Sequence, residues 1–323
     1  MSKIKLNLPA EWKPISISKI EDTGPVDWIW KGYLAKGGLT LLSGIWKGGK
    51  TTLLSLLCKG LTTDEKVVIG TPIRKARTLV VTEEKQGRWY NRHKIHNFGE
   101  GELYIISRPF KGVFPSFERW NALLNNLVYY AEHGGLEVVI MDTFASMYPV
   151  KSENDAAEIQ RALTSFVKLQ EKGVAVLLTH HVTKSSTFAA FNSRGSGNIQ
   201  SPTDTNIFFS YYPKAPRGDR RRVLSAESRD DETPDELVIE LSEDKTTYTT
   251  LGTVQEADTE AQEGRVSSIL PLEPPGLTLE EIMRRTGGKK TRTRDLLNRM
   301  VEDETICCSK GGVRGKPKKY WLI

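Results

Sequence analysis

Short apolar runs bounded by polar turns recur through the first two thirds of the chain. They lie at 39–44, 78–81, 103–106, 136–141, 174–178 and 206–211. Helical periodicity occupies the intervening segments 51–60, 117–132 and 156–170. Runs of this length are typical of buried strands, and their alternation with helices predicts a mostly parallel sheet flanked by helices. After Tyr212 come three short segments, 221–228, 236–241 and 246–251, which predict an antiparallel extension.

The end of the chain predicts a small domain of its own. Helices are expected at 261–270, 278–285 and 291–302, followed by a hairpin that ends in KYWLI. Three short helices and a two-stranded wing are typical of a winged helix-turn-helix. Because 323 residues accommodate two domains, we predict an α/β domain over residues 1–252 and a winged-helix domain over 253–323, with a linker at about 252–260.

Charge is distributed unevenly between these two regions. The net charge is +6, yet the chain from Arg284 onward holds twelve Lys and Arg against four Asp and Glu, a local balance of +8. The rest therefore has 34 basic and 36 acidic side chains, a balance of −2. A basic tail is where a polyanion binds, so we expect DNA to contact the C-terminal region.

The segment GIWKGGKT at 44–51 matches the P-loop pattern G-x-x-x-x-G-K-[ST] without a mismatch. It stands between a predicted strand and a predicted helix, where backbone N–H groups and the helix dipole favour phosphate. Lys50 is expected to neutralise β- and γ-phosphate oxygens of ATP, and Thr51 to ligate Mg²⁺. The predicted nucleotide-binding residues are Gly44, Lys47, Gly48, Gly49, Lys50, Thr51 and Thr52.

Carboxylates follow two of the other apolar runs. Asp142 ends VVIMD and is expected to complete the magnesium shell. Glu83 and Glu84 end TLVVTEE, at the same sheet edge as the P-loop if the strands are parallel. Only one of the two can orient the attacking water, and we favour Glu83, with Glu84 left open. An exposed acidic turn is the alternative interpretation of this pair.

Several segments together resemble a known family. GIWKGGKT, TEEKQGRW, IMDTFASMYPVKSENDAAEI, LLTHHVTK and SRGSGNIQSPTDTN resemble the RecA-like hexameric ATPases of the RepA type, which are plasmid replicative helicases and AAA family ATPases. The resemblance covers about residues 25–245, and HHVTK with RGS is its most discriminating part. It implies a RecA-like P-loop core, a homo-oligomer such as a hexamer with active sites at subunit interfaces, and ATP-driven work in replication or maintenance of a plasmid, phage or mobile element.

The resemblance also implies roles for individual residues. Glu83 matches the catalytic glutamate, and His180 matches a sensor of the γ-phosphate. Lys184 and Arg194 match basic residues that reach into the site of the neighbouring subunit, where a guanidinium would stabilise charge on the transferring phosphoryl group. Trp46 and Lys47 depart from the family because small residues are commoner inside the loop, and a winged tail is not shared by all of its helicases.

The basic tail presents cations around its last predicted helix and in the wing. An apolar stripe on 291–302 leaves the other faces of this helix free to enter a DNA groove. The predicted DNA-binding residues are Lys289, Lys290, Arg292, Arg294, Arg299, Lys316 and Lys318. A second basic run, KAPRGDRRR at 214–222, could touch nucleic acid or a neighbouring phosphate, or form a solvated hairpin turn.

Other features exclude classes of protein or leave alternatives open. No apolar run is long enough for a membrane helix and no signal peptide is evident, so we expect a cytoplasmic protein. Three cysteines and the pair His93 and His96 indicate no metal site. The main hypothesis is a helicase, helicase loader or initiator accessory that works with replication or mobile-element proteins. The alternatives are an ATP-regulated, sequence-specific DNA-binding regulator without motor activity and a KaiC-like signalling ATPase.

Overall fold

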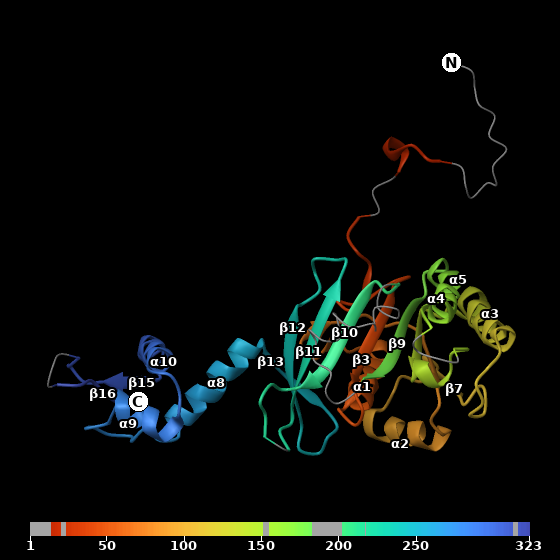
Figure 1. The fold of residues 1–323 in the computed structure, drawn as a ribbon. Helices are drawn as coiled ribbons and strands as arrows, with labels where there is room; N and C mark the ends of the chain where they lie inside the picture. The colour runs from red at the N-terminus through yellow and green to blue at the C-terminus, as the bar shows by residue number, and fades with distance from the viewer. Residues whose placement is uncertain (1–13, 21–23, 151–154, 183–201, 217, 313–315) are drawn as a thin grey trace.

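The computed structural model describes residues 14–20, 24–150, 155–182, 202–216, 218–312 and 316–323. Its centre is a nine-stranded sheet with the strand order β13-β12-β11-β10-β3-β9-β8-β6-β7 (Figure 1). The strands are β3 (Leu39–Ile45), β6 (Thr78–Thr82), β7 (Leu103–Ser107), β8 (Val138–Asp142), β9 (Ala175–Val182), β10 (Thr205–Tyr211), β11 (Arg221–Ser228), β12 (Glu236–Leu241) and β13 (Tyr248–Gly252).

The strand directions confirm the predicted α/β fold. All neighbouring pairs from β10 to β7 are parallel, whereas β11, β12 and β13 extend the sheet in antiparallel fashion. The large, mostly parallel sheet is that of a RecA-like P-loop core. Because parallel strands connected by helices all point the same way, their carboxyl ends lie along one edge, where such sheets bind ligands.

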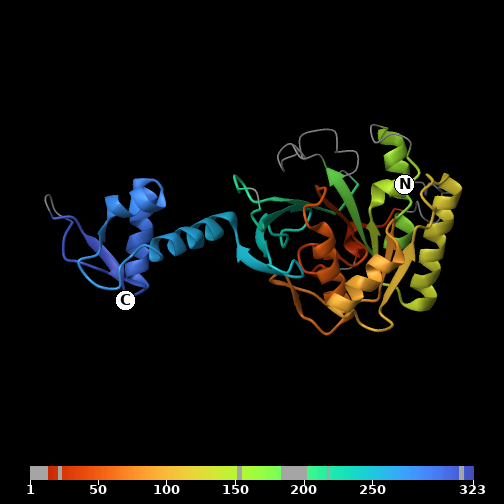
Figure 2. The same cartoon turned by 90° about the horizontal axis from the view of Figure 1, so that it is seen from below.

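Helices cover both faces of the sheet, as Figure 2 shows with α1 and α2 on one side and α3 to α5 on the other. Their bounds are α1 (Lys50–Thr62), α2 (Gln86–His96), α3 (Phe117–Gly134), α4 (Ala156–Thr164) and α5 (Val167–Gln170). The central strands alternate between two cores. Val80 packs with Leu53 of α1, while the adjacent Val81 packs with Trp120 of α3. Burial on both faces explains why these strands read as continuous apolar runs.

Smaller elements complete the N-terminal half. The 3-10 helix η2 (Ile17–Lys19) precedes two small hairpins, β1 (Trp28–Trp30) with β2 (Leu34–Ala35), and β4 (Val67–Val68) with β5 (Thr71–Pro72). A further 3-10 turn, η3 (Phe144–Ser146), follows β8. Trp30 is buried in the same core as α1, so the β1 segment packs onto the main sheet.

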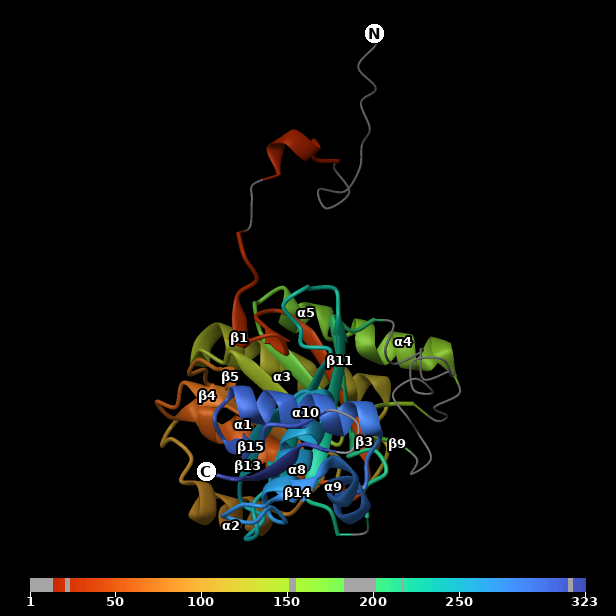
Figure 3. The same cartoon turned by 90° about the vertical axis from the view of Figure 1, so that its left-hand side faces the viewer.

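The C-terminal unit, residues 254–323, has an α-β-α-α-β-β order and a core of its own. Its elements are α8 (Val254–Ser267), β14 (Leu277–Thr278), α9 (Leu279–Thr286), α10 (Lys290–Glu302), β15 (Ile306–Cys308) and β16 (Lys319–Leu322). Val266, Ile282, Leu297 and Tyr320 are among the residues that form the core. The sheet has the order β14-β16-β15, so a third strand joins the predicted two-stranded hairpin. Figure 1 shows these elements at one end of the molecule, and Figure 3 views them from that end.

Helix α8 begins well before the predicted start at 261, and the stretch expected to be a linker is helical. Thr253 accepts a hydrogen bond from the backbone N–H of Glu256, whose carboxylate accepts one from Thr253 N–H. This capping box satisfies two backbone donors that would otherwise be unpaired and so fixes the start of the helix at Val254.

Helix α8 contributes to two hydrophobic clusters. Ala257 near its start belongs to one cluster with Val223 and Val238 of the large sheet and with Tyr212, which follows β10, and Tyr212 Oη donates to Asp258 Oδ1 at 2.6 Å. Val266 near its end belongs to the core of the C-terminal unit. One continuous helix therefore joins the sheet to the C-terminal unit (Figure 1).

Candidate active site

The P-loop connects the end of β3 to the start of α1. Gly49 is the N-cap of α1 and has φ 109°, a left-handed value that glycine adopts freely. A Cβ at Gly49 would lie 2.2 Å from Tyr248 Oη, and one at Gly44 would lie 2.6 Å from the carbonyl oxygen of Phe209. The loop therefore needs glycine at both positions because neighbouring strands press against it.

Lys50 lies buried at the base of this loop. Its ammonium donates to the carbonyl oxygens of Gly44 and Ile45, the second at 3.1 Å, and Nζ lies 3.0 Å from Nδ1 of His181. Burial lowers the pKa of Lys50 to about 8, opposed by the charge of Asp142. The partners of this buried cation among the described residues are neutral, which suits an anionic ligand, because phosphate oxygens would restore the solvation that burial removes.

The strand register brings the acidic candidates to the same edge. Thr82 of β6 pairs with Asp142 of β8, so the two strands end side by side. Asp142 is half-buried and accepts a hydrogen bond from Thr179 Oγ1 at 3.0 Å. Burial raises the pKa of its carboxyl group, an effect that a bound cation would reverse. A carboxylate and the Thr51 hydroxyl are oxygen ligands of the kind Mg²⁺ prefers, so this edge fits the predicted metal.

The two glutamates after β6 have different surroundings. Glu84 forms ion pairs with Arg88 at 3.0 Å and with Arg92. Burial alone would raise the pKa of Glu84, but these arginines outweigh it and lower the pKa. Glu83 is exposed, and its backbone N–H donates to the carbonyl oxygen of Asp142 at 3.2 Å. Among the described residues no ion pair holds the Glu83 carboxylate, and its catalytic role stays a prediction.

The histidine that meets the P-loop lysine is His181, whereas the sequence pointed to His180. Strand β9 continues to Val182, so the two histidines are on the strand and their side chains alternate between its faces. His181 pairs in register with Gly44, and its Nε2 lies 3.5 Å from Thr143 Oγ1. Burial, followed by the charge of Lys50, lowers the pKa of His181, which favours the neutral ring. His180 is buried, next to Ser43 in register.

Two residues outside the predicted nucleotide-binding set contact the P-loop from the antiparallel strands. Arg222 of β11 is only 8% exposed, and its Nε donates to the carbonyl oxygen of Gly48 at 2.7 Å. Tyr248 of β13 donates from its hydroxyl to the carbonyl oxygen of Gly49 at 3.4 Å. No local pattern marks these contacts, because they depend on the order of the antiparallel strands.

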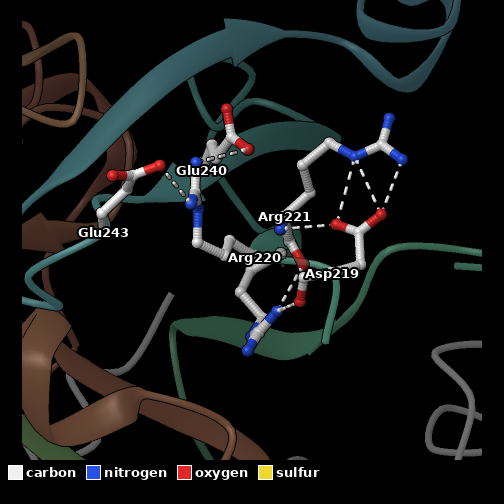
Figure 4. A network of polar contacts seen from close by, with 6 residues as sticks. Asp219, Arg220, Arg221, Glu240 and Glu243 are labelled. Carbon is white, nitrogen blue, oxygen red and sulfur yellow. Dashed lines mark hydrogen bonds and ion pairs between the residues drawn. The ribbon is translucent and has the colours of Figure 1, made fainter. Parts of the chain in front are cut away.

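The basic run at 214–222 is largely neutralised within the chain. Arg221 forms an ion pair with Asp219 at 2.7 Å, and Arg220 lies 3.2 Å from Glu243 and 3.7 Å from Glu240 (Figure 4). Together with the buried guanidinium of Arg222, these contacts within the chain favour the hairpin-turn interpretation of this run over contact with nucleic acid.

The remaining predicted site residues are placed as follows. Lys47 Nζ lies 4.3 Å from the ring centroid of the exposed Trp46, and Thr52 is half-buried in the first turn of α1. Lys184 and Arg194 lie outside the described residues. In the part of the chain that the structure describes, no group of three or more His, Cys, Asp or Glu could hold a metal, and no helix is long and apolar enough to cross a bilayer.

The C-terminal cations are exposed but differ in their contacts. Exposed side chains on and before α10 include Lys289, the N-cap residue, and Lys290, Arg292 and Arg294. Arg299, in contrast, forms an ion pair with Glu263 of α8 at 2.6 Å. Lys316 and Lys318 are exposed in the segment before β16. Arg299 therefore holds α10 against α8, and the other six cations face solvent.

Comparison with known proteins places these residues in a family. The model of a protein family described as an AAA domain matches residues 10–187, more than half of the chain. This range includes the P-loop, Glu83, Asp142 and His181. No curated protein matches the chain.

Proposed function

The chain belongs to the AAA domain family, and from this premise we propose that it is an ATP-hydrolysing oligomeric ATPase that works on DNA. Family membership supports an AAA-type ATPase that binds nucleotide. The observation that carries the proposal is the convergence of Lys50, Asp142 and His181 at the carboxyl edge of the sheet, with Glu83 beside Asp142. The proposed biological role is the one implied by the RepA-type resemblance, replication or maintenance of a mobile element.

The residues of this edge would divide the work of hydrolysis. The ammonium of Lys50 would exchange its carbonyl partners for β- and γ-phosphate oxygens of ATP. Bound Mg²⁺ would supply positive charge to the phosphates, and Thr51 and Asp142 would hold it. Glu83 would orient the attacking water because its carboxylate, unlike that of Glu84, is not held by arginines. His181, beside Lys50, would sense whether the γ-phosphate is present.

Assembly and DNA binding complete the proposal. Lys184 and Arg194 would act on the site of a neighbouring protomer in a homo-oligomer, a hexamer by resemblance. The C-terminal unit would be a winged helix-turn-helix domain that begins at residue 253 and binds duplex DNA, with α10 as its recognition helix. Its helix order and its exposed cations support this assignment.

A hydrolysis assay on the full chain tests the catalytic part. The wild-type protein should release phosphate from ATP in the presence of Mg²⁺, and Lys50→Ala should reduce the rate by about 100-fold or more. Lys59→Ala on the same helix is the matched control, since Lys59 lies in the last turn of α1, at the other end of the helix from the P-loop, and forms an ion pair with Glu65. Equal rates in wild type and Lys50→Ala would refute hydrolysis at this loop.

A regulator without motor activity is the second candidate function. It is favoured by one observation, that α8 runs unbroken from the sheet into the C-terminal unit, so that nucleotide state could set the placement of a DNA-binding unit. Titration of duplex DNA into the hydrolysis assay separates the candidates. A motor should hydrolyse ATP several-fold faster with DNA, whereas the regulator should show one preferred duplex sequence and an unchanged rate.

A further inference from the structure

A cavity opens beside Glu83, and its lining contains no residue of the P-loop. It has a volume of about 400 Å³ and lies between the segment that follows β7 and the turn η3. Its lining residues are Glu83, Arg108, Pro109, Phe110, Lys111, Gly112, Phe114, Ser146 and Met147. Glu83 is the only one of them assigned above to nucleotide hydrolysis, and the volume is within the range of small-ligand sites.

The lining combines two cations with aromatic rings. Phe110 is buried beneath the guanidinium of Arg119, whose Cζ lies 5.6 Å from the ring centroid, whereas Phe114 is 68% exposed. The exposed Phe114 shares this lining with Arg108 and Lys111, and such a combination of ring and cations is how proteins hold single-stranded nucleic acid, with bases stacked on rings and phosphates on cations. A protein partner would instead favour a broader apolar surface with fewer charges at its centre.

The backbone of this segment is strained at two positions. Arg108 and Lys111 both have φ 54°, in the left-handed region that residues with a side chain rarely adopt. Such strain persists where surrounding contacts enforce it, and it is concentrated at ligand sites. Here the contacts include the Arg108 N–H, which donates to the carbonyl oxygen of Thr82 at 2.7 Å.

Arg108 connects the cavity to the catalytic edge. Its Nε donates to the carbonyl oxygen of Glu83 at 2.9 Å, while the N–H of Glu83 donates to Asp142. A phosphate that drew the guanidinium of Arg108 toward the cavity would therefore act directly on the backbone that carries Glu83.

We propose that this cavity binds one nucleotide of single-stranded DNA, with the base on Phe114 and a phosphate on Arg108 and Lys111, and that its occupancy adjusts Glu83. The inference deepens the proposed ATPase function, and it gives the sheet domain a DNA site separate from the C-terminal unit. Single strands would bind here and duplex DNA on α10.

The test uses the full chain with a fluorescein-labelled oligothymidylate and an unlabelled duplex of equal length. In Phe114→Ala/Lys111→Ala, the Kd for the single strand should rise about tenfold and its stimulation of hydrolysis should disappear, while duplex affinity stays as in wild type. The matched control is Tyr90→Ala/Lys94→Ala. It removes another exposed aromatic and cation pair, in which Tyr90 is 59% exposed and Lys94 Nζ lies 4.6 Å from its ring. This control should bind both DNA forms as wild type does.

The outcomes separate this inference from the proposed function. Wild-type rates and single-strand affinity in the double variant would overturn the cavity site and leave the ATPase standing. Loss of assembly by mass measurement, with single-strand binding intact, would overturn it in favour of a contact between protomers. A wild-type protein without hydrolysis would refute the ATPase, while the binding assay would still decide the cavity. Phe114→Tyr should retain stacking. If the double variant does not fold, Lys111→Glu alone should weaken the binding of single-stranded DNA.

Discussion

The sheet edge and the C-terminal unit use charged residues in opposite ways. At the sheet edge, Lys50, Glu83, Asp142 and His181 come from four distant parts of the chain and meet because parallel strands end together. Lys50 is buried and Asp142 is half-buried, and the loss of solvent around each shifts its pKa. In the C-terminal unit, the exposed cations come from two short stretches, one on and before α10 and one before β16. The proposed chemistry at the edge therefore depends on exact geometry, whereas the proposed DNA binding by the C-terminal unit depends on charge density.

The largest effect is expected for the glutamates that follow β6. Glu83→Gln should lower the rate of ATP hydrolysis by about 1,000-fold, because the amide cannot orient and polarise the attacking water as the carboxylate does. Glu84→Gln should cost far less, since this carboxylate serves the ion pairs with Arg88 and Arg92. Single-turnover phosphate release, with nucleotide binding measured separately, checks both. If Glu84→Gln lost more activity than Glu83→Gln, Glu84 would be the catalytic carboxylate. The contrast between the two regions would then rest on the wrong residue at the sheet edge.

The next largest effect is expected when one buried leucine in each of the two hydrophobic cores is changed to alanine. Leu297 is fully buried in the small core of the C-terminal unit, and Leu177 is fully buried in the large core beneath the sheet. Each change to Ala should cost about 2–5 kcal/mol of unfolding free energy. That cost is a large share of the stability of a small unit, so Leu297→Ala should abolish duplex binding while DNA-free hydrolysis continues.

Calorimetry provides the measurement for this pair. Leu297→Ala should remove or lower a transition of the C-terminal unit and leave the main one in place, whereas Leu177→Ala should lower the Tm of the main transition. A single transition that shifts equally in both variants would show that α8 couples the two cores into one cooperative unit.

A smaller effect is expected where β11 supports the P-loop. Arg222→Ala leaves the carbonyl oxygen of Gly48 without its buried donor, a loss of about 1–2 kcal/mol that corresponds to roughly tenfold weaker nucleotide binding. Arg229→Ala is the control, because that side chain is exposed and its distance of 3.9 Å from Asp204 is too long for a strong ion pair. Titration with a fluorescent ATP analogue measures both. Unchanged affinity in Arg222→Ala would mean that the loop keeps its shape without outside support.

The sequence predicted most of the fold, for reasons seen in particular elements. β11 and β12 begin and end where the apolar pattern placed them, because turn residues bound both. The start of α8 was wrong, although Thr253 and Glu256 have the capping-box spacing that could have indicated it. β14 has two residues and exists only through its pairing with β16, so no local signal predicts it.

The candidate site was predicted only as far as its residues lie in local motifs. The glycines of the P-loop, Asp142 and the Glu83/Glu84 pair each follow an apolar run. Whether His180 or His181 faces the P-loop depends on the alternation of side chains along β9. A shift of one residue moves a side chain to the other face of the sheet. Arg222 and Tyr248 reach the P-loop only because β10 places the antiparallel strands beside β3, and a single sequence does not show that order.

The smallest effect concerns single cations of the C-terminal unit. Lys290→Gln and Arg292→Gln should each weaken duplex binding only a few-fold and reduce the slope of log affinity against log salt by about one. Both side chains are exposed on α10, so each change removes one counterion-releasing contact and leaves the fold unchanged. Arg299→Gln should leave the slope as in wild type, because Arg299 is paired with Glu263 within the chain. Binding titrations at several salt concentrations separate the two kinds of cation. If Arg299→Gln lowered the slope and Lys290→Gln did not, the DNA would contact the α8 side of α10, and the tail would depend on specific geometry as the sheet edge does.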